Sequence, residues 1–266
     1  MTQAIFHERC LSVVIPAFNE ERSLAQIVEK VLDLPQLKEV IIVDDCSTDR
    51  TGEIASALSE SYPAVRCVRL PTNSGKTEAL KAGFALSTGE IVIVQDADLE
   101  YDPSEIPSVI EPIVNGVADV VYGSRFLVRK TTRVLYFYHY LANKTLTFIS
   151  NLFTNTNMTD VETCYKAFRG EIIRKMVITS SGFGFEIEVT AKVAKLRCRI
   201  YEVPISYYGR TYDEGKKIGF WDGVAAVWYI FFFNAYCPAR DSFTVPIAEI
   251  TAALACRKSL VDDTRR

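Results

Sequence analysis

Short β-favouring runs, two of them apolar throughout, alternate with helical patterns in the first half of this chain. The runs lie at 11–16, 40–43, 65–70, 91–94 and 119–122. Runs that are apolar at every position are typical of strands buried on both faces, as in parallel sheets. The segments between them carry apolar residues at helical spacing. This alternation predicts an α/β fold with a parallel, doubly wound sheet flanked by helices.

A polar cluster follows each of four of these runs. The clusters are PAFNE at 16–20, DDCS at 44–47, NSGK at 73–76 and DADLE at 96–100. In open α/β sheets, ligands bind beyond the carboxyl ends of the strands. Because all four clusters fall at such ends, we expect them to line one pocket.

The last of these clusters is acidic. Asp96, Asp98 and Glu100 lie at two-residue spacing, so their carboxylates emerge on one side if the chain stays extended. Carboxylates that point together repel one another unless a cation lies among them, and hard oxygen ligands of this type suit Mg²⁺ or Mn²⁺. The alternative is a solvated acidic loop without a ligand. Asp102, which precedes a proline, is expected to cap a helix.

Composition argues against several classes of protein. The chain has 266 residues and a net charge of −3, so no basic field favours a nucleic-acid partner. Its seven cysteines form no CxxC pair, which argues against a zinc site or a disulfide framework and favours a reducing compartment. The first ten residues carry charges and no apolar core, and no run of about 20 apolar residues follows. We therefore expect neither a signal peptide nor a transmembrane helix.

Taken as a set, the motifs resemble those of the family 2 glycosyltransferases with the GT-A fold. In the family's order, the chain carries VVIPAFNEE, IIVDDCSTDRT, NSGK, QDADLEYDP and VYGSRF. Its later stretches DVETCYKAFRGE, FGFEIEVTAKVAK and YEVPISYYGRTYDEGKK are similar to the branch of dolichyl- and polyprenyl-phosphate mannosyl and glucosyl synthases. The resemblance covers roughly residues 10 to 220. It implies a GT-A domain over 1–220, with an interfacial acceptor helix at 129–153, and a helical extension over 221–266.

On the donor side, the resemblance implies that Pro16, Ala17, Phe18 and Glu20 hold the nucleotide's base and ribose, and that Asp45 hydrogen-bonds the base. The chemistry agrees, because an aromatic face stacks on a base and carboxylates accept hydrogen bonds from its N–H groups. The alternative is that Pro16 and Phe18 only end a strand and that Asp45 caps the next helix.

The donor's diphosphate is assigned to a cation and to the acidic set. Lys76 follows Gly75 just before a helix, where its charge and the free N–H groups both favour phosphate. The resemblance places Asp98, with Glu100, on a Mg²⁺ or Mn²⁺ ion that bridges the diphosphate, and Asp96 close to the ribose or the metal. Such an ion neutralises the charge that develops on the departing nucleoside diphosphate.

Three further groups complete the predicted catalytic set. Arg125 is expected to contact a phosphate, because its planar fork suits phosphate, although a surface salt bridge is the alternative. Asp160 is expected near the reaction centre as a base or as a positioning group. Positioning is favoured because a phosphate acceptor, with a second pKa of about 6, needs no strong base. Arg210, Lys216 and Lys217 are implied to swing over the donor or acceptor phosphates, the alternative being an exposed basic loop.

The stretch 129–153 is unusual for a soluble domain. Basic residues, among them Arg133, precede a run of aromatic residues. Aromatic rings beside basic groups suit the lipid–water interface, whereas the alternative is a buried helix with a charged start. In the resembled synthases this region receives the lipid phosphate, which makes Arg133 and His139 candidates for binding the acceptor phosphate. A lone histidine, however, is more often a structural residue.

Two other stretches each allow two interpretations. Glu186 and Glu188, two residues apart at a predicted helix start, either compensate the charge of that helix terminus or support the active site. The stretch 221–237 is apolar but too short to cross a bilayer unaided, and Pro238 ends it. It is expected either to lie in the membrane interface or to cover the core.

These inferences combine into one predicted function. We expect a metal-dependent, inverting glycosyltransferase that moves mannose or glucose from GDP-mannose or UDP-glucose to a polyprenyl or dolichyl phosphate. It would be cytoplasmic and would contact the cytoplasmic face of a membrane peripherally. One alternative keeps the enzyme but gives it a soluble sugar or a protein hydroxyl as acceptor. A second is a nucleotide-sugar-binding module without turnover, against which the intact acidic set argues.

Overall fold

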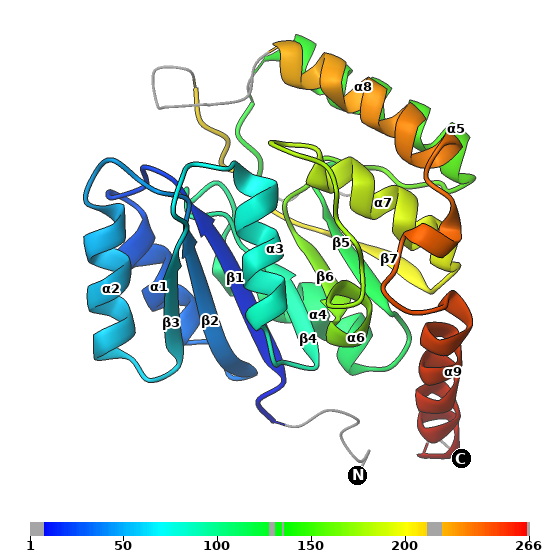
Figure 1. Ribbon diagram of the computed structural model, residues 1–266, viewed down its shortest axis with the longest axis horizontal. Helices are drawn as coiled ribbons and strands as arrows, with labels where there is room; N and C mark the ends of the chain where they lie inside the picture. The colour runs from blue at the N-terminus through cyan, green and yellow to red at the C-terminus, as the bar shows by residue number, and fades with distance from the viewer. Residues whose placement is uncertain (1–7, 128–130, 135, 212–219, 265–266) are drawn as a thin grey trace.

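A seven-stranded sheet forms the centre of the computed structural model, which describes residues 8–127, 131–134, 136–211 and 220–264 (Figure 1). Its strands are β1 (Leu11–Ala17), β2 (Leu37–Asp44), β3 (Val65–Arg69), β4 (Ile91–Val94), β5 (Val120–Ser124), β6 (Lys166–Arg169) and β7 (Ile200–Pro204). Their order in the sheet is β3-β2-β1-β4-β6-β5-β7. Strand β6 is antiparallel to both of its neighbours, and the other neighbouring pairs are parallel. The predicted α/β fold with a mostly parallel sheet is confirmed.

Most of the strands that the apolar pattern predicts have side chains that are buried on both faces of the sheet. Val13 in β1 and Ile93 in β4 have no exposed surface, because helices cover both faces of the sheet there. Strand β6 carries no such pattern, since two of its four residues are Lys166 and Arg169, and both are buried. Arg169 Nε lies 3.0 Å from Asp119 Oδ1, so a partner far away in the sequence makes this buried charge tolerable.

Helices pack on both faces of the sheet. They are α1 (Leu24–Leu32), α2 (Thr51–Ser61), α3 (Lys76–Leu86), α4 (Ile106–Val114), α6 (Gly170–Ile173) and α7 (Phe185–Leu196), with short 3₁₀ turns at Pro103–Glu105 and Ala239–Asp241. In Figure 1, α3 and α7 lie in front of the sheet and α1 and α4 behind it. The side chain of Asp102 accepts a hydrogen bond from Ser104 N at 3.2 Å, which confirms its predicted role as a cap.

Two long helices, α5 (Phe137–Thr154) and α8 (Phe220–Ala235), pack side by side beyond the sheet (Figure 1). Helix α5 begins later than 129, because the chain before it pairs with another segment instead. Arg133 N donates to Tyr207 O and Tyr207 N to Thr131 O, each at 3.0 Å. Within the described residues, no helix is both long enough and apolar enough to span a membrane.

The C-terminal helices share the core of the sheet. A third long helix, α9 (Ile247–Thr264), lies apart from the α5–α8 pair in Figure 1. Ile230 of α8 and Ile250 of α9 are nonetheless buried in the same hydrophobic cluster as the central strands. The predicted division into a domain over 1–220 and an extension over 221–266 stays a prediction.

Candidate active site

A cavity of about 1130 Å³ lies at the carboxyl ends of the parallel strands. Most of the residues predicted from the sequence line it, namely Pro16, Ala17, Phe18, Glu20, Asp45, Lys76, Asp96, Asp98, Glu100, Arg125, His139 and Arg210. Asp160 and Arg133 lie outside this lining. Lys216 and Lys217 fall outside the described residues. The expectation that the polar clusters share one pocket is therefore confirmed.

Asp45 ties the end of β2 to the loop before α3. Its Oδ1 accepts a hydrogen bond from Ser74 N at 2.7 Å, and its Oδ2 accepts one from Gly75 N at 2.8 Å. The alternative, that Asp45 caps α2, does not hold. The residue at the N-cap of α2 is Arg50, and the side chain that accepts from the first helical N–H, Thr51 N, is that of Asp49 at 2.9 Å.

Lys76 stands at the start of α3 between two carboxylates. Its Nζ lies 2.9 Å from Asp96 Oδ1 and 3.0 Å from Glu186 Oε1. Burial by itself lowers the pKa of Lys76, but the two carboxylates outweigh burial and raise this pKa well above its usual value. Lys76 is therefore a permanent cation in the cavity.

The acidic set converges through a turn, and not along an extended chain as predicted. Leu99 has a φ of 62°, which bends the backbone, and Asp98 Oδ1 accepts from Glu100 N at 3.1 Å. Asp98 and Glu100 then meet at Arg210, whose Nη2 lies 2.7 Å from Asp98 Oδ2 and whose Nε lies 3.3 Å from Glu100 Oε1. Asp96 points instead to the lysine at the start of α3.

Arg210 supplies the positive charge that this set needs. Burial, together with Asp96 and Glu100, raises the pKa of Asp98 to about 7, although Arg210 opposes this rise. Glu20 adds a further carboxylate at 3.4 Å from Arg210 Nη1. Over the part of the chain that the structure describes, no three acidic, histidine or cysteine side chains are arranged to hold a metal ion. The carboxylate oxygens of Asp98 and Glu100 nevertheless fit Mg²⁺ or Mn²⁺ in type and charge, and such an ion would compete with Arg210 for them.

Arg125 is fixed by Asp160. Its Nε lies 2.7 Å from Asp160 Oδ2, its Nη2 lies 2.8 Å from Oδ1, and its backbone N–H donates to Oδ2 at 3.1 Å. Asp160 has no exposed surface, whereas Arg125 reaches the cavity wall. The guanidinium carbon also lies 5.1 Å from the ring centre of Tyr207. Arg125 is thus a buried, oriented cation and not part of a surface salt bridge.

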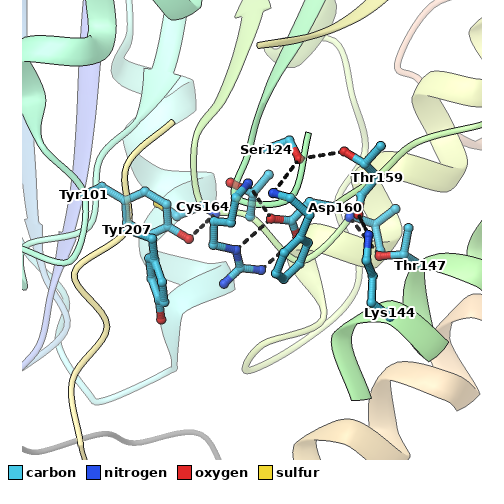
Figure 2. A network of polar contacts seen from close by, with 12 residues as sticks. Tyr101, Ser124, Lys144, Thr147, Thr159, Asp160, Cys164 and Tyr207 are labelled. Carbon is cyan, nitrogen blue, oxygen red and sulfur yellow. Dashed lines mark hydrogen bonds and ion pairs between the residues drawn. The ribbon is translucent and has the colours of Figure 1, made fainter. Parts of the chain in front are cut away.

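Figure 2 shows the surroundings of this pair, with Tyr101 and Tyr207 to one side of Asp160 and Thr159 and Thr147 to the other. Tyr101 Oη accepts a hydrogen bond from Cys164 N at 3.2 Å, and Val161 N donates to Thr147 Oγ1 at 3.3 Å. Both contacts hold the backbone that follows Asp160, which limits the freedom of the carboxylate to turn away from Arg125.

The acceptor candidates are placed differently from one another. His139 lines the cavity, and its ring centre lies 5.3 Å from that of Tyr136. Arg133 Nη1 donates to Gly209 O at 3.2 Å, which holds this side chain on the segment before Arg210. Neither contact tests a phosphate-binding role, so both residues stay predictions.

The two glutamates of α7 have different surroundings, and neither predicted role is tested. Glu188 is buried, accepts hydrogen bonds from Thr179 N and Ser180 N, and pairs with Lys192. Glu186 lines the cavity. Sequence reasoning also missed Glu162, a cavity residue whose pKa is raised to about 7 by burial and by the charge of Glu186. No local pattern marks Glu162, because it lies in a loop between α5 and β6.

Helices α5 and α8 line another part of the cavity, and most of the side chains they contribute are apolar. These are Leu141, Ala142 and Leu146 from α5 and Val224, Ala226 and Val227 from α8, together with the polar residues His139, Asn143, Thr145 and Asp222. The same two helices expose large apolar side chains, namely Phe137, Tyr138, Phe148, Leu152 and Phe153 on α5 and Trp221, Trp228, Phe231 and Tyr236 on or just after α8. The cavity therefore joins a charged end to a mostly apolar end beside an exposed aromatic surface.

This sheet and cavity belong to a known class of enzymes. The chain is a member of glycosyl transferase family 2, whose model matches residues 12–177. It is a glycosyltransferase with the GT-A fold. Family membership favours the enzyme over the alternative of a non-catalytic binding module.

Two proteins and one crystal structure show what the chain is similar to in sequence and in fold. The chain is 31% identical over 229 residues to an undecaprenyl-phosphate mannosyltransferase of Micrococcus luteus, covering 80% of this chain and 90% of that protein. It is 35% identical over 172 residues to an undecaprenyl-phosphate 4-deoxy-4-formamido-L-arabinose transferase of Pectobacterium carotovorum, covering 63% of this chain and 51% of that one. A crystal structure of glucosyl-3-phosphoglycerate synthase from Mycobacterium tuberculosis has a TM-score of 0.67 at 21% identity, covering 87% of this chain and 82% of that chain. At that identity the likeness shows the fold alone.

Proposed function

We propose that this glycosyltransferase moves a hexose, with inversion at the anomeric carbon, from a nucleotide-sugar to a polyprenyl phosphate. One observation carries the proposal: a single cavity joins a charged end at the strand termini to a mostly apolar end between α5 and α8. A nucleotide-sugar needs the first and a lipid chain needs the second. The names of the relatives, which include the words undecaprenyl-phosphate, support the lipid acceptor.

The donor is assigned to the edge formed by the ends of β1 and β2. Phe18 and Pro16 would contact the base and ribose, with Glu20 and Asp45 as acceptors for their polar hydrogens. Lys76 would contact the diphosphate, because it is a partly buried cation at the N-terminus of a helix. GDP-mannose and UDP-glucose are the two donors that we propose to test.

A divalent ion is proposed on the acidic set. Asp98 and Glu100, with Asp96 close by, would hold Mg²⁺ or Mn²⁺ through their carboxylate oxygens. When bound, the ion supplies positive charge that stabilises the departing diphosphate. The Mycobacterium tuberculosis synthase was crystallised with Mn²⁺ and UDP-glucose, but the proposal here rests on this chain's own carboxylates.

The acceptor phosphate is assigned to Arg125. Its bidentate pair with Asp160 holds the guanidinium in one orientation at the cavity wall. A phosphate oxygen then attacks the anomeric carbon, so that an oxygen–carbon bond forms while the bond from that carbon to the leaving diphosphate oxygen breaks. Arg133, His139 and Lys217 remain candidates for further contacts with the acceptor phosphate.

The geometry of Asp160 argues against a soluble hydroxyl acceptor. Such an acceptor has to lose a proton, which requires a general base. Under this alternative Asp160 would be the base, but it is fully buried and both of its oxygens bind Arg125. A lipid phosphate, which is already ionised near neutral pH, needs no base and so suits this site better.

Peripheral membrane contact follows from the outer surfaces of α5 and α8. Tyr138 is 80% exposed, Trp221 78% and Phe148 68%, and exposed aromatic residues at this density suit a lipid–water interface. We propose that these helices lie on a membrane, on its cytoplasmic face, so that a lipid phosphate can enter the apolar end of the cavity.

The deciding experiment measures release of nucleoside diphosphate from GDP-mannose and from UDP-glucose, with Mg²⁺ or Mn²⁺, with and without a polyprenyl phosphate in detergent or vesicles. We expect release that requires both one of the donors and the lipid phosphate. Release that is indifferent to the lipid would contradict the proposed acceptor and leave only a glycosyltransferase of unknown acceptor.

A further inference from the structure

Two carboxylate oxygens in the cavity lack partners. Glu162 Oε1 and Glu186 Oε2 are buried from solvent and accept no hydrogen bond from any described residue. Glu186 is only 6% exposed, and both side chains line the cavity. A buried carboxylate oxygen without a partner costs free energy, so a site of this kind calls for a ligand that donates hydrogen bonds.

The two glutamates lie between the donor side and the acceptor side of the cavity. The other oxygen of Glu186 lies 3.0 Å from Lys76 Nζ, which also binds Asp96 at 2.9 Å. Burial and the charge of Glu186 raise the pKa of Glu162, whereas the charge of Arg125 lowers this pKa, so Glu162 interacts with both neighbours. A sugar held between the proposed diphosphate site at Lys76 and the proposed phosphate site at Arg125 would therefore lie beside these glutamates.

Charge selects the kind of ligand. Two carboxylates repel a phosphate, and nearby cations already balance part of their charge, because Lys76 pairs with Glu186 and buried Lys166 interacts with both glutamates. Lys166 itself is held by the backbone oxygens of Val161 and Thr163. The two carboxylate oxygens without partners therefore need hydrogen-bond donors more than they need a further cation. The hydroxyl groups of a neutral sugar are such donors.

We propose that Glu162 and Glu186 bind the hydroxyl groups of the donor's hexose and determine which hexose the enzyme accepts. This inference rests on the proposed function. Similarity to the two named relatives does not identify the sugar that this enzyme transfers, because one is a transferase of mannose and the other of a substituted arabinose. The proposed role of the two glutamates bears on that choice of sugar.

The test compares binding of the nucleotide with binding of the nucleotide-sugar. Dissociation constants are measured by calorimetry for GDP against GDP-mannose and for UDP against UDP-glucose, in the wild type and in Glu162→Gln and Glu186→Gln. The glutamine side chain keeps the shape of glutamate. Glu39→Gln is the matched control, because Glu39 is buried to nearly the same extent as Glu186 but accepts hydrogen bonds from Ser12 and Thr88 near the amino ends of the strands.

We expect each cavity variant to lose about 10-fold or more affinity for the nucleotide-sugar relative to its affinity for the nucleoside diphosphate. The preference between GDP-mannose and its epimer GDP-glucose, measured as the ratio of kcat/KM, should also shift by about 10-fold or more. The control variant should change neither quantity by more than about twofold.

Three outcomes would overturn the inference. Equal losses for nucleotide and nucleotide-sugar would indicate a general structural role, and unchanged affinity and sugar preference would show that the hexose lies elsewhere. In both cases wild-type transfer to polyprenyl phosphate would leave the proposed function intact. If the wild type neither binds nor turns over either donor, the proposed function fails and the inference fails with it.

Discussion

The two arginines of the cavity, Arg125 and Arg210, are held in different ways. Arg125 makes a bidentate pair with one carboxylate, Asp160, which is itself fully buried. Arg210 is shared among three carboxylates, Glu20, Asp98 and Glu100, in the cavity lining. The first arrangement fixes one orientation, whereas the second offers several similar contacts.

This difference separates a preorganised group from a replaceable one. Breaking a buried bidentate pair leaves an uncompensated charge, so Arg125 keeps its place whether or not a ligand is present. The carboxylates around Arg210 need positive charge, and a divalent ion supplies it as well as a guanidinium does. We therefore expect Arg125 to belong to the permanent site and Arg210 to exchange partners during turnover.

The largest effect is expected from Asp98→Asn, which weakens the acidic set on the side of Arg210. Nucleoside diphosphate release with donor, metal and polyprenyl phosphate should fall by at least about 10³-fold, equivalent to about 4 kcal/mol of transition-state stabilisation. The fold should survive, since burial disfavours the charged form of Asp98 and raises its pKa to about 7.

Asp102→Asn is the matched control for this variant. Asp102 lies four residues further on and caps a 3₁₀ turn, which asparagine also does, so release should stay within about twofold of the wild type. A folded Asp98→Asn enzyme with a wild-type rate would refute the proposed role of Asp98.

A second prediction concerns Arg125, the arginine with a single buried partner. Asp160→Asn removes the charged partner of Arg125, so the KM for polyprenyl phosphate should rise by about 100-fold while the KM for the donor stays nearly constant. The free energy of unfolding should also fall by about 3 kcal/mol, as measured by denaturant titration.

Asp119→Asn separates these two effects. Asp119 pairs with Arg169 and Arg199 away from the cavity, so this variant should lose stability but keep the acceptor KM. If Asp160→Asn instead lowers kcat alone and recovers at raised pH, Asp160 acts as a general base and the positioning role is wrong.

A third prediction tests whether a metal ion and Arg210 compete. Arg210→Ala should bind Mn²⁺ about 10-fold more tightly than the wild type in the absence of donor, as measured by calorimetry or electron paramagnetic resonance. Arg125→Ala, whose partner is Asp160 and not the acidic set, should bind Mn²⁺ as the wild type does. Equal affinities in all three proteins would show that Arg210 does not occupy the metal's place.

The smallest effect concerns Glu162, which neighbours Arg125. Its pKa is raised to about 7 by burial and Glu186, with Asp160 adding to the rise and Lys166 and Arg125 opposing it. Because the folded pKa exceeds the unfolded value of about 4.3, the stability from protonated Glu162 is complete below the unfolded pKa and is lost as pH rises through about 7.

Glu162→Gln removes this loss. Its free energy of unfolding relative to the wild type should therefore increase by more than about 1 kcal/mol between about pH 5 and about pH 8. In Glu39→Gln the difference should stay constant over that range, since hydrogen bonds lower the pKa of Glu39 despite its burial and it is ionised throughout. A flat difference for Glu162→Gln would show that Glu162 is ionised in the folded state at pH 5.

The sequence by itself determined the framework of the donor side. Apolar runs at β1, β2 and β4 predict buried parallel strands, and the carboxyl ends of such strands lie along the same side of the sheet. Residues placed directly after those strands, such as Asp45 and Asp96, could therefore be assigned to one pocket before any contact was known.

Tertiary structure alone decided how the charges pair. Asp98 meets Arg210 across 112 residues of sequence, and Arg125 meets Asp160 across 35. Strand β6 and the cavity position of Glu162 also carry no local pattern. The physical reason is that strand and helix patterns arise from neighbouring residues, whereas the burial, pKa and partner of a charged group depend on segments that only folding brings together.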